Sequence, residues 1–377
     1  MWDLIVVGLG PAGSTAARIA AEMGLKVLGL DREVFPRYKP CAAGLTGRAL
    51  KEIPVDCDEY IELKITTALI SLYDLAPIPV ENEEGLMFTT RRETMDTLLV
   101  KAAGDSGAVI REGFCVKSLE ERDVGITVKS IDGQEEQARF VVGADGANGK
   151  CNRYLNKGIG EFLPSWEVEF SYDRKRNEPM ASCVRFDLGI VKRGYGWAFP
   201  KNDTVAVGVA GKLSSRAEVD QAFKAMMSRL PGSASWNPLI QRGHPIPVFN
   251  SKRIFGGSRV LLTGDAGGLI DPFLGEGIYH ALVSGRIAAN WVSSNLHNDT
   301  PDYEGYKREI SKTIGSELKL AARLAAVIYR FPGLMFRITS RSPGVLKNFA
   351  ESLCSDGGYK EFSAGVGYPY KLIFLNM

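Results

Sequence analysis

The stretch "WDLIVVGLGPAGSTAARIAAEMGLKVLGLD", residues 2–31, decides the fold of this chain. It reads as a buried β-strand, a glycine-rich turn, a helix of small residues, a second strand and an acid. Gly8 makes the tight turn, Gly10 lets the backbone approach a pyrophosphate, and Gly13 lets helix and strand pack closely. Asp31 ends the second strand, where a carboxylate can accept ribose hydroxyls. The stretch predicts a Rossmann-like dinucleotide site but does not by itself separate FAD from NAD.

Two later strands also end in an aspartate followed by small residues, which is more than a nicotinamide enzyme needs. They are "RFVVGADGANGKCNR", with Asp145, and "RVLLTGDAGGLIDPFLGEGI", with Gly264 and Asp265. With the first stretch, they resemble the three-part fingerprint of FAD proteins with the p-hydroxybenzoate hydroxylase type of fold. That resemblance implies that Asp265 reaches the ribityl and pyrophosphate region and that Asp145 orders the turn beside the pyrophosphate.

The last of these segments runs into the expected helix "GIYHALVSGRIAANWV". Gly275, Gly277 and Ile278 open it, so we expect their backbone N–H groups to point outward with the positive end of the helix dipole behind them. Such a terminus suits the N1–C2=O edge of an anionic reduced flavin. The alternative is a plain loop before a helix.

Two weaker signals lie between the fingerprint segments. In "TTRRETMDTLLVKAA", Arg92 and Asp96 match the R-x-x-x-D pattern that this fold places beside the flavin. In "GFCVKSL", the backbone of Val116 is expected to meet the adenine. A solvated arginine and a core valine are the alternatives.

The segment "FPRYKPC", residues 35–41, sets one thiol after two backbone-stiffening prolines and before small residues that permit close approach to a planar ring. With "YGWAFP", residues 195–200, it resembles the geranylgeranyl reductase family, whose members carry Pro-Cys followed by small residues and a Y-x-W-x-F-P motif. Two departures affect the expected pocket wall. Ala42 follows the cysteine where glycine is frequent in the family, and Gly208-Val209-Ala210 replaces an expected Gly-x-Gly.

The resemblance implies that Cys41, Ala42 and Gly44 lie against the flavin. Tyr195, Trp197 and Phe199 alternate along a strand, so their rings share one face of a sheet. We expect the rings to line the substrate cavity, with ordinary core packing as the alternative. Catalytic roles are expected for Cys41, as the proton donor, and for Tyr195 and Trp197. A bound water or the flavin is the alternative proton donor, and Cys41 is then a residue packed against the ring or a redox-sensitive thiol. His244 and His280 belong to no motif.

The implied activity is an FAD-dependent reductase that saturates isolated C=C bonds of geranylgeranyl or other prenyl chains in isoprenoid lipids. The alternatives are a flavin monooxygenase, hydroxylase or halogenase of the same fold, and a non-catalytic flavoprotein redox sensor. A halogenase is disfavoured because that group resembles W-x-W-x-I-P at the aromatic motif. The sequence leaves open whether the substrate is a diphosphate, a phospholipid or a quinone. It also leaves open whether NAD(P)H or a ferredoxin-type protein donates the electrons.

The composition of the chain limits the classes of partner and the cellular compartment that we expect. The chain of 377 residues is 45% hydrophobic and 24% charged, with a net charge of +2, so a nucleic-acid partner is not expected. Six cysteines without a C-x-x-C pair indicate a reducing compartment. We expect a cytoplasmic protein without a membrane span and without a bound metal. Beyond residue 300, apolar residues mixed with Lys and Arg predict helices, either packed on the substrate domain or lying on a membrane surface.

The expected fold class is α/β, α+β overall: a Rossmann-like FAD-binding domain, a mostly antiparallel substrate sheet and a helical C-terminal region. The FAD-binding domain is predicted to be discontinuous, with residues 1–60, 88–155 and 255–300. Residues 61–87 and 156–254 are assigned to the substrate domain, and residues 301–377 to the C-terminal region.

Overall fold

The computed structural model describes residues 1–73, 75–122, 124–156, 162–173, 182–257, 259–298 and 300–367. Residues 157–161 and 174–181 of the predicted substrate domain, and 368–377 of the predicted C-terminal region, lie outside these ranges. Three sheets are present within the described residues. The expected fold class is confirmed, because a parallel sheet, a mostly antiparallel sheet and a helical C-terminal region are all present.

The first sheet has the order β17-β18-β11-β1-β2-β8, with the hairpin β9–β10 attached to β11. Strands β18, β11, β1, β2 and β8 run parallel. The strands are β1 (Trp2–Val7), β2 (Val27–Leu30), β8 (Val109–Arg111), β9 (Val116–Arg122), β10 (Gly125–Ser130), β11 (Glu135–Gly143), β17 (Gly256–Gly257) and β18 (Val260–Leu262).

Both faces of this sheet are buried, as expected for parallel strands. On β1, Leu4 and Val6 face one hydrophobic cluster, and Ile5 and Val7 face another. The helices α1 (Pro11–Glu22), α3 (Arg92–Asp105) and α7 (Ile278–Asn295) cover the first face. The hairpin and α4 (Lys150–Asn156) cover the second. Gly285 lets α7 cross α1 closely, because a Cβ there would lie 2.2 Å from the carbonyl oxygen of Ala12.

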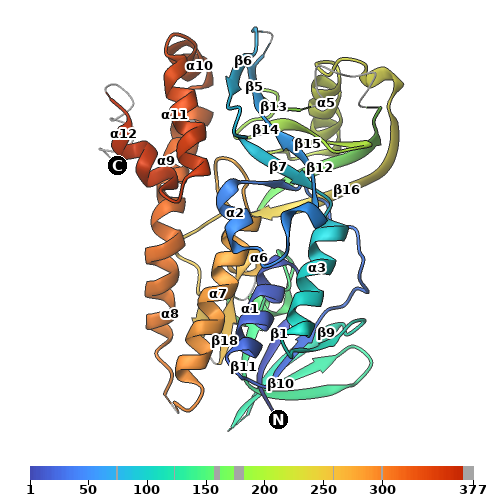
Figure 1. The fold of residues 1–377 in the computed structure, drawn as a ribbon, viewed down its shortest axis with the longest axis vertical. Coiled ribbons are helices and arrows are strands. Elements are labelled where there is room, and N and C mark those ends of the chain that lie inside the picture. The colour runs from blue at the N-terminus through green and yellow to red at the C-terminus, as the bar shows by residue number, and fades with distance from the viewer. Residues whose placement is uncertain are drawn as a thin grey trace.

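The second sheet lies in the upper half of Figure 1 and has the order β16-β12-β15-β14-β13-β5-β6. Its strands are β5 (Thr67–Leu72), β6 (Ile78–Glu81), β12 (Phe162–Ser171), β13 (Cys183–Leu188), β14 (Tyr195–Pro200), β15 (Thr204–Ala210) and β16 (Asn237–Pro247). One face of this sheet packs against α5 (Arg216–Met227), and the opposite face is turned toward the first sheet.

A small third sheet joins β3 (Gly44–Leu45), β7 (Met87–Thr90) and β4 (Ile61–Ile65) between the two larger ones. Two short helices, α2 (Gly47–Glu52) and α6 (Gly264–Gly267), lie in the same middle layer. The domain boundaries given above stay a prediction.

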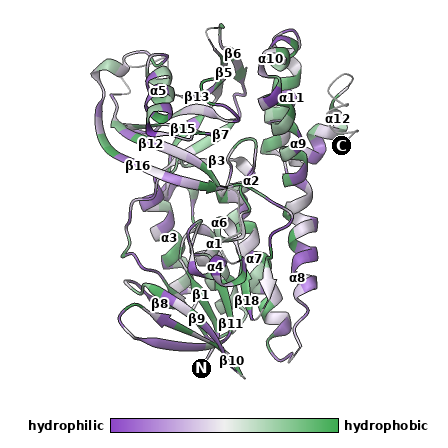
Figure 2. Cartoon of the chain, turned by 180° about the vertical axis from the view of Figure 1, so that it is seen from behind, coloured by the Kyte–Doolittle hydropathy of each residue, from purple (hydrophilic) through white to green (hydrophobic). Residues whose placement is uncertain are grey.

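The C-terminal helices run along one side of the molecule (Figure 1). They are α8 (Tyr303–Ile310), a π-helical turn at Ser311–Gly315, α9 (Ser316–Arg330), α10 (Pro332–Ser340), α11 (Pro343–Cys354) and α12 (Gly358–Gly365). Helices α10 and α11 contact β5 and β6, as the packed alternative required. They mix hydrophobic and hydrophilic residues (Figure 2), and none of the helices in the described part of the chain has the length and hydropathy to cross a bilayer. Contact with a membrane surface stays a prediction.

Candidate active site

A cleft of about 580 Å³ lies where the glycine-rich turns meet the aromatic face of the second sheet. This volume falls within the range of roughly 300–1,000 Å³ that is usual for small-molecule sites. Apart from Gly13, the predicted site residues line it: Gly8, Gly10, Asp31, Cys41, Ala42, Gly44, Arg92, Val116, Asp145, Tyr195, Trp197, Phe199, Gly264, Asp265, Gly275, Gly277 and Ile278. The structure therefore brings together residues that lie more than 200 positions apart in the sequence.

The glycines of the first turn have different roles. Gly8 has φ +91, and a Cβ at Gly13 would lie 1.8 Å from its carbonyl oxygen, so Gly13 serves the close packing of α1 against β1. At Gly10 the nearest atom to a Cβ would be Nη2 of Arg37, at 3.6 Å. Gly10 thus leaves space at the beginning of α1, where no side chain caps the helix. Free N–H groups and the helix dipole there favour a phosphate group.

Asp31 lines the cleft but also holds the turn. One carboxylate oxygen accepts the backbone N–H of Leu9 at 2.7 Å, and the other accepts that of Glu33 at 2.9 Å. A carboxylate oxygen can accept more than one hydrogen bond, so ribose hydroxyls can still bind to Asp31.

Unpartnered polar atoms in the cleft wall test whether a polar cofactor fits. Within the described residues, Nη1 of Arg37, the hydroxyl of Tyr38 and Oδ1 of Asp145 are buried without a hydrogen-bond partner. The other carboxylate oxygen of Asp145 accepts the backbone N–H of Cys151 at 3.0 Å. Burial raises the pKa of Asp145. Buried polar atoms normally have partners, so these atoms and the open glycine turn fit a dinucleotide with hydroxyl and phosphate groups.

The third segment differs from expectation at one position. Helix α7 begins at Ile278, with Gly277 as its uncapped N-terminal residue, as predicted. The backbone N–H of Gly275, however, donates to the carbonyl oxygen of Asp271 at 3.0 Å and is not free for a cofactor. Gly275 instead has φ +70 and closes the turn that leads to the helix.

Asp265 stands opposite Lys39, from the segment "FPRYKPC", and His244, which belongs to no motif. Its carboxylate lies 3.9 Å from Nε2 of His244, and Nζ of Lys39 lies 2.8 Å from that same nitrogen. Burial alone would raise the pKa of Asp265, but His244 and Lys39 outweigh it and the pKa is lowered. Burial lowers the pKa of Lys39.

Arg92 connects α3 to the thiol. Its guanidinium forms a bidentate pair with Asp96, at 2.8 and 2.7 Å, so the R-x-x-x-D pattern is an i,i+4 ion pair. Burial lowers the pKa of Arg92, but the contributions of Asp96 and Cys41 raise this pKa by more than burial lowers it. The net shift is therefore upward. The sulfur of Cys41 also accepts the backbone N–H of Ala43 at 3.3 Å.

The rings of Tyr195, Trp197 and Phe199 share the cleft-facing side of β14, as their alternation predicted. Trp197 and Phe199 are also buried in a cluster with Leu63 and Val184, so they contribute to the core as well as to the cleft wall. Gly44 makes room for Phe199, whose ring would lie 2.7 Å from a Cβ at that position.

Trp197 reaches across the neighbouring strand to a buried glutamate. Residues Glu167, Gly208 and Trp197 stand side by side on β12, β15 and β14. A Cβ at Gly208 would lie 2.2 Å from the indole ring, so this glycine lets the ring cross β15. The indole N–H donates to Oε2 of Glu167 at 3.3 Å, and Oε1 accepts the backbone N–H of Cys41 at 2.7 Å.

Among the cleft residues that the predicted site did not include are Glu167, Lys39 and His244. The signal for Glu167 was present in "WEVEF", where acids at alternate positions share the face that carries the aromatic rings on β14. Using it required the strand order, which places β12 and β14 on either side of β15.

Comparisons with known proteins agree with this geometry. A geranylgeranyl diphosphate reductase of Rhodobacter capsulatus is 33% identical, over 80% of this chain and 77% of the relative. A digeranylgeranylglycerophospholipid reductase of Methanopyrus kandleri is 31% identical, over 81% and 84%. No protein-family model matches the chain.

Solved structures share the fold. A geranylgeranyl bacteriochlorophyll reductase-like protein from Thermoplasma acidophilum superimposes with a TM-score of 0.81 at 21% identity, over 99% of this chain and 97% of that one. A flavin-dependent brominase superimposes with a TM-score of 0.75 at 18% identity, over 98% and 96%.

The fold and its relatives define an oxidoreductase. The chain belongs to the geranylgeranyl reductase family, at 33% and 31% identity to the two reductases above.

Proposed function

We propose that this protein binds FAD in the cleft and saturates isolated C=C bonds of geranylgeranyl or related prenyl chains. The observation that supports this most is the meeting, in one cleft, of the dinucleotide-type turns, Cys41 and the aromatic face of β14. The family includes a geranylgeranyl diphosphate reductase and a digeranylgeranylglycerophospholipid reductase, which supports a prenyl chain as the substrate.

The residues for FAD follow the geometry of the cleft. The uncapped beginning of α1, with Gly8 and Gly10, would receive the pyrophosphate. Asp31 would receive the adenosine ribose, and the backbone of Val116 the adenine. Asp145, Gly264 and Asp265 would hold the middle of the cofactor, and the beginning of α7, at Gly277 and Ile278, the flavin edge. A reduced flavin, when bound, supplies a hydride to one alkene carbon.

Cys41 would supply the proton for the other carbon. An isolated alkene has no carbonyl group to accept electron density, so protonation has to accompany hydride addition. The S–H group of a thiol can donate a proton of this kind. Arg92 and the Ala43 N–H would face the sulfur after the proton has left.

The aromatic wall would position the prenyl chain and stabilise developing charge. Positive charge falls on the tertiary carbon, and each ring face contributes roughly 0.5–2 kcal/mol to its stabilisation when water is excluded. The hydroxyl of Tyr195 donates to the carbonyl oxygen of Leu274, and the indole of Trp197 donates to Glu167, so hydrogen bonds fix both rings.

The test is anaerobic incubation of dithionite-reduced, FAD-loaded protein with geranylgeranyl diphosphate, a digeranylgeranylglycerophospholipid and an isoprenoid quinone, each followed by lipid mass spectrometry. Dithionite removes the need to know the natural electron donor. Gain of two hydrogens per reduced bond supports the proposal. Oxygen incorporation under air without saturation would indicate a hydroxylase, and FAD binding without turnover of the three lipids would indicate a sensor.

A further inference from the structure

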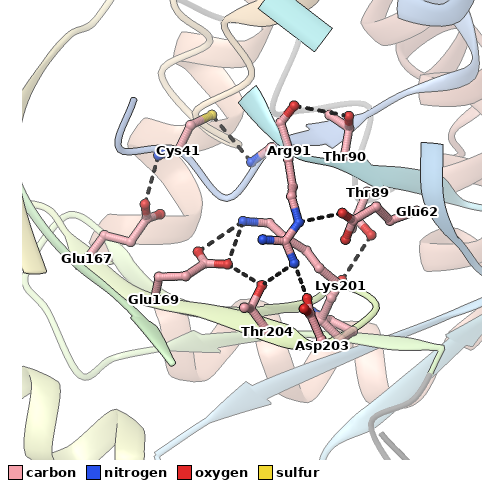
Figure 3. Close-up of polar contacts among 12 residues, drawn as sticks. Cys41, Glu62, Thr89, Thr90, Arg91, Glu167, Glu169, Lys201, Asp203 and Thr204 are labelled. Carbon is pink, nitrogen blue, oxygen red and sulfur yellow. Dashed lines mark hydrogen bonds and ion pairs between the residues drawn. The ribbon is translucent and has the colours of Figure 1, made fainter. Parts of the chain in front are cut away.

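Glu167 is a buried acid in the wall of the cleft, and the reaction above gives it no part in proton transfer. Its side chain stands between Cys41 and Trp197 and accepts a hydrogen bond from each (Figure 3 shows the contact with Cys41). The residue is only 3% exposed. A carboxylate in such a place is costly unless it is neutralised or protonated.

A second acid, Glu169, lies two residues along β12 on the same face, and it is paired. Lys201 donates to both its carboxylate oxygens at 2.9 Å, and the hydroxyl of Thr204 donates to it as well (Figure 3). The hydrogen bonds of Lys201 thus go to Glu169. Both hydrogen bonds printed for Glu167 come from neutral N–H groups, which leaves its negative charge less compensated and favours its protonated form.

A small cavity of about 80 Å³ adjoins the cleft at this point. Its wall includes Glu169, Lys201 and Thr204, and it shares Cys41 and Arg92 with the cleft. Charged and polar side chains stand in its wall, and it has room for water, which needs only about 10–15 Å³ per molecule. From Thr204, hydrogen bonds continue to Arg91 and to Asp203, whose side chain is 76% exposed. Polar groups therefore lead from the surface to the neighbourhood of Glu167.

The electrostatics agree with this geometry. Burial raises the pKa of Glu167 to about 7, with Glu169 raising it and Lys201, the Cys41 N–H and the Trp197 indole lowering it. Other titratable or charged groups of the surrounding walls include Tyr38, Lys39, Arg91, Arg92, Glu93, His244 and, exposed on β16, Arg242. A carboxylic acid with this pKa can both release and regain a proton near neutral pH.

We propose that Glu167 is the proton reservoir of the cleft, which returns a proton to Cys41 after each alkene reduction. The inference rests on the proposed function. Reduced flavin provides the hydride, the Cys41 thiol gives its proton to the other carbon, and a thiolate remains. The Glu167 carboxyl group then protonates the thiolate across one water molecule of the cleft, and water in the small cavity reprotonates Glu167. Each cycle consumes one hydride and one solvent proton.

The first test compares the first turnover with later ones. Dithionite-reduced Glu167→Gln should reduce about one bond per site with geranylgeranyl diphosphate at the wild-type rate, because Cys41 still carries its own proton. Later turnovers should be slower by about 10²-fold, the usual contribution of a proton-transfer group. Glu120→Gln, which changes an exposed carboxylate on β9 outside the cleft, should behave as wild type.

The second test follows pH, because a merely structural role would not move a pH profile in two opposite directions. The steady-state rate of the wild type should fall as pH rises past about 7. Glu169→Gln removes a charge that raises the pKa of Glu167, so the fall should move to lower pH. Lys201→Met removes a charge that lowers it, so the fall should move to higher pH. FAD occupancy and thermal unfolding of each variant exclude misfolding as the cause.

A third readout does not need turnover. Infrared difference spectra of wild type minus Glu167→Gln should show a protonated carboxylic acid that titrates near pH 7. A carboxylate that stays ionised across neutral pH would overturn the inference, as would repeated full-rate turnover in Glu167→Gln. Loss of even the first turnover in Glu167→Gln, with Cys41→Ala still active, would also overturn it, because Glu167 would then be the direct donor. If wild type saturates none of the three lipids, the proposed function itself fails, and the inference with it.

Discussion

Replacing Glu167 by glutamine should change how the stability of the folded protein depends on pH. The native carboxyl group keeps its proton up to about pH 7, whereas the unfolded chain loses it near the ordinary value of 4.5. Between these values the native state binds more protons than the unfolded state, so the free energy of unfolding falls as pH rises through this window and levels off above it. At about 1.36 kcal/mol per pKa unit, the fall amounts to about 3 kcal/mol.

Glutamine cannot ionise, so this fall should be missing from Glu167→Gln. The assay is denaturant unfolding of FAD-saturated wild type and variant at several pH values from about 4 to about 8, spanning both pKa values of the group. Other titrating groups act on both proteins and cancel in the difference. The wild type should lose about 3 kcal/mol more than the variant across this range. Parallel curves would refute the claim that Glu167 is protonated in the native state, and Glu120→Gln should give curves parallel to wild type.

Three further predictions concern the cleft. Gly10→Val should fold, because its Cβ meets only arginine side chains at 3.6 Å or more, but it should lose FAD absorbance. Gly13→Val should fail to fold, because its Cβ would overlap the Gly8 carbonyl group. Normal FAD content in Gly10→Val would count against the proposed site. Cys41→Ala should bind FAD but lose most lipid turnover, and full activity would show that the proton comes from elsewhere. Trp197→Ala should leave FAD reduction by dithionite intact while slowing alkene reduction and changing the pattern of partly saturated products. An unchanged rate and pattern would place that strand in the core alone, and Phe170→Leu, on the α5 side of the sheet, is the matched control.

The fold could be predicted because its signals are local. Residues 2–31 carry the strand, turn, helix and second strand in one continuous run, and the alternation in "YGWAFP" gives the face of its rings without knowledge of the neighbours. The beginning of α7 at Ile278 followed from its preceding glycines in the same way.

The missed parts depend on contacts between distant segments. Glu167 and Glu169 alternate with Val168 and Phe170, a pattern typical of a strand with one solvated face. The structure buries that polar face because the loop that carries Cys41 lies against it, through a contact between residues 126 positions apart. Likewise, Gly208 is the first glycine of the expected Gly-x-Gly, in which the departure is Ala210, and only the structure shows that Gly208 makes the space that the Trp197 ring crosses.

The pairing of Lys39 with His244 depends on the same kind of distant contact, since these residues lie 205 positions apart. The free N–H expected at Gly275 was wrong for a local reason. The turn from Asp271 closes on that group before the helix begins.

The most direct test of the central claim is lipid mass spectrometry after anaerobic incubation of the dithionite-reduced, FAD-loaded protein with the three prenyl lipids. The account predicts products heavier by two hydrogens per reduced bond from at least one of them, with the gain lost in Cys41→Ala. Unchanged lipids with fully reduced, FAD-loaded protein would contradict it.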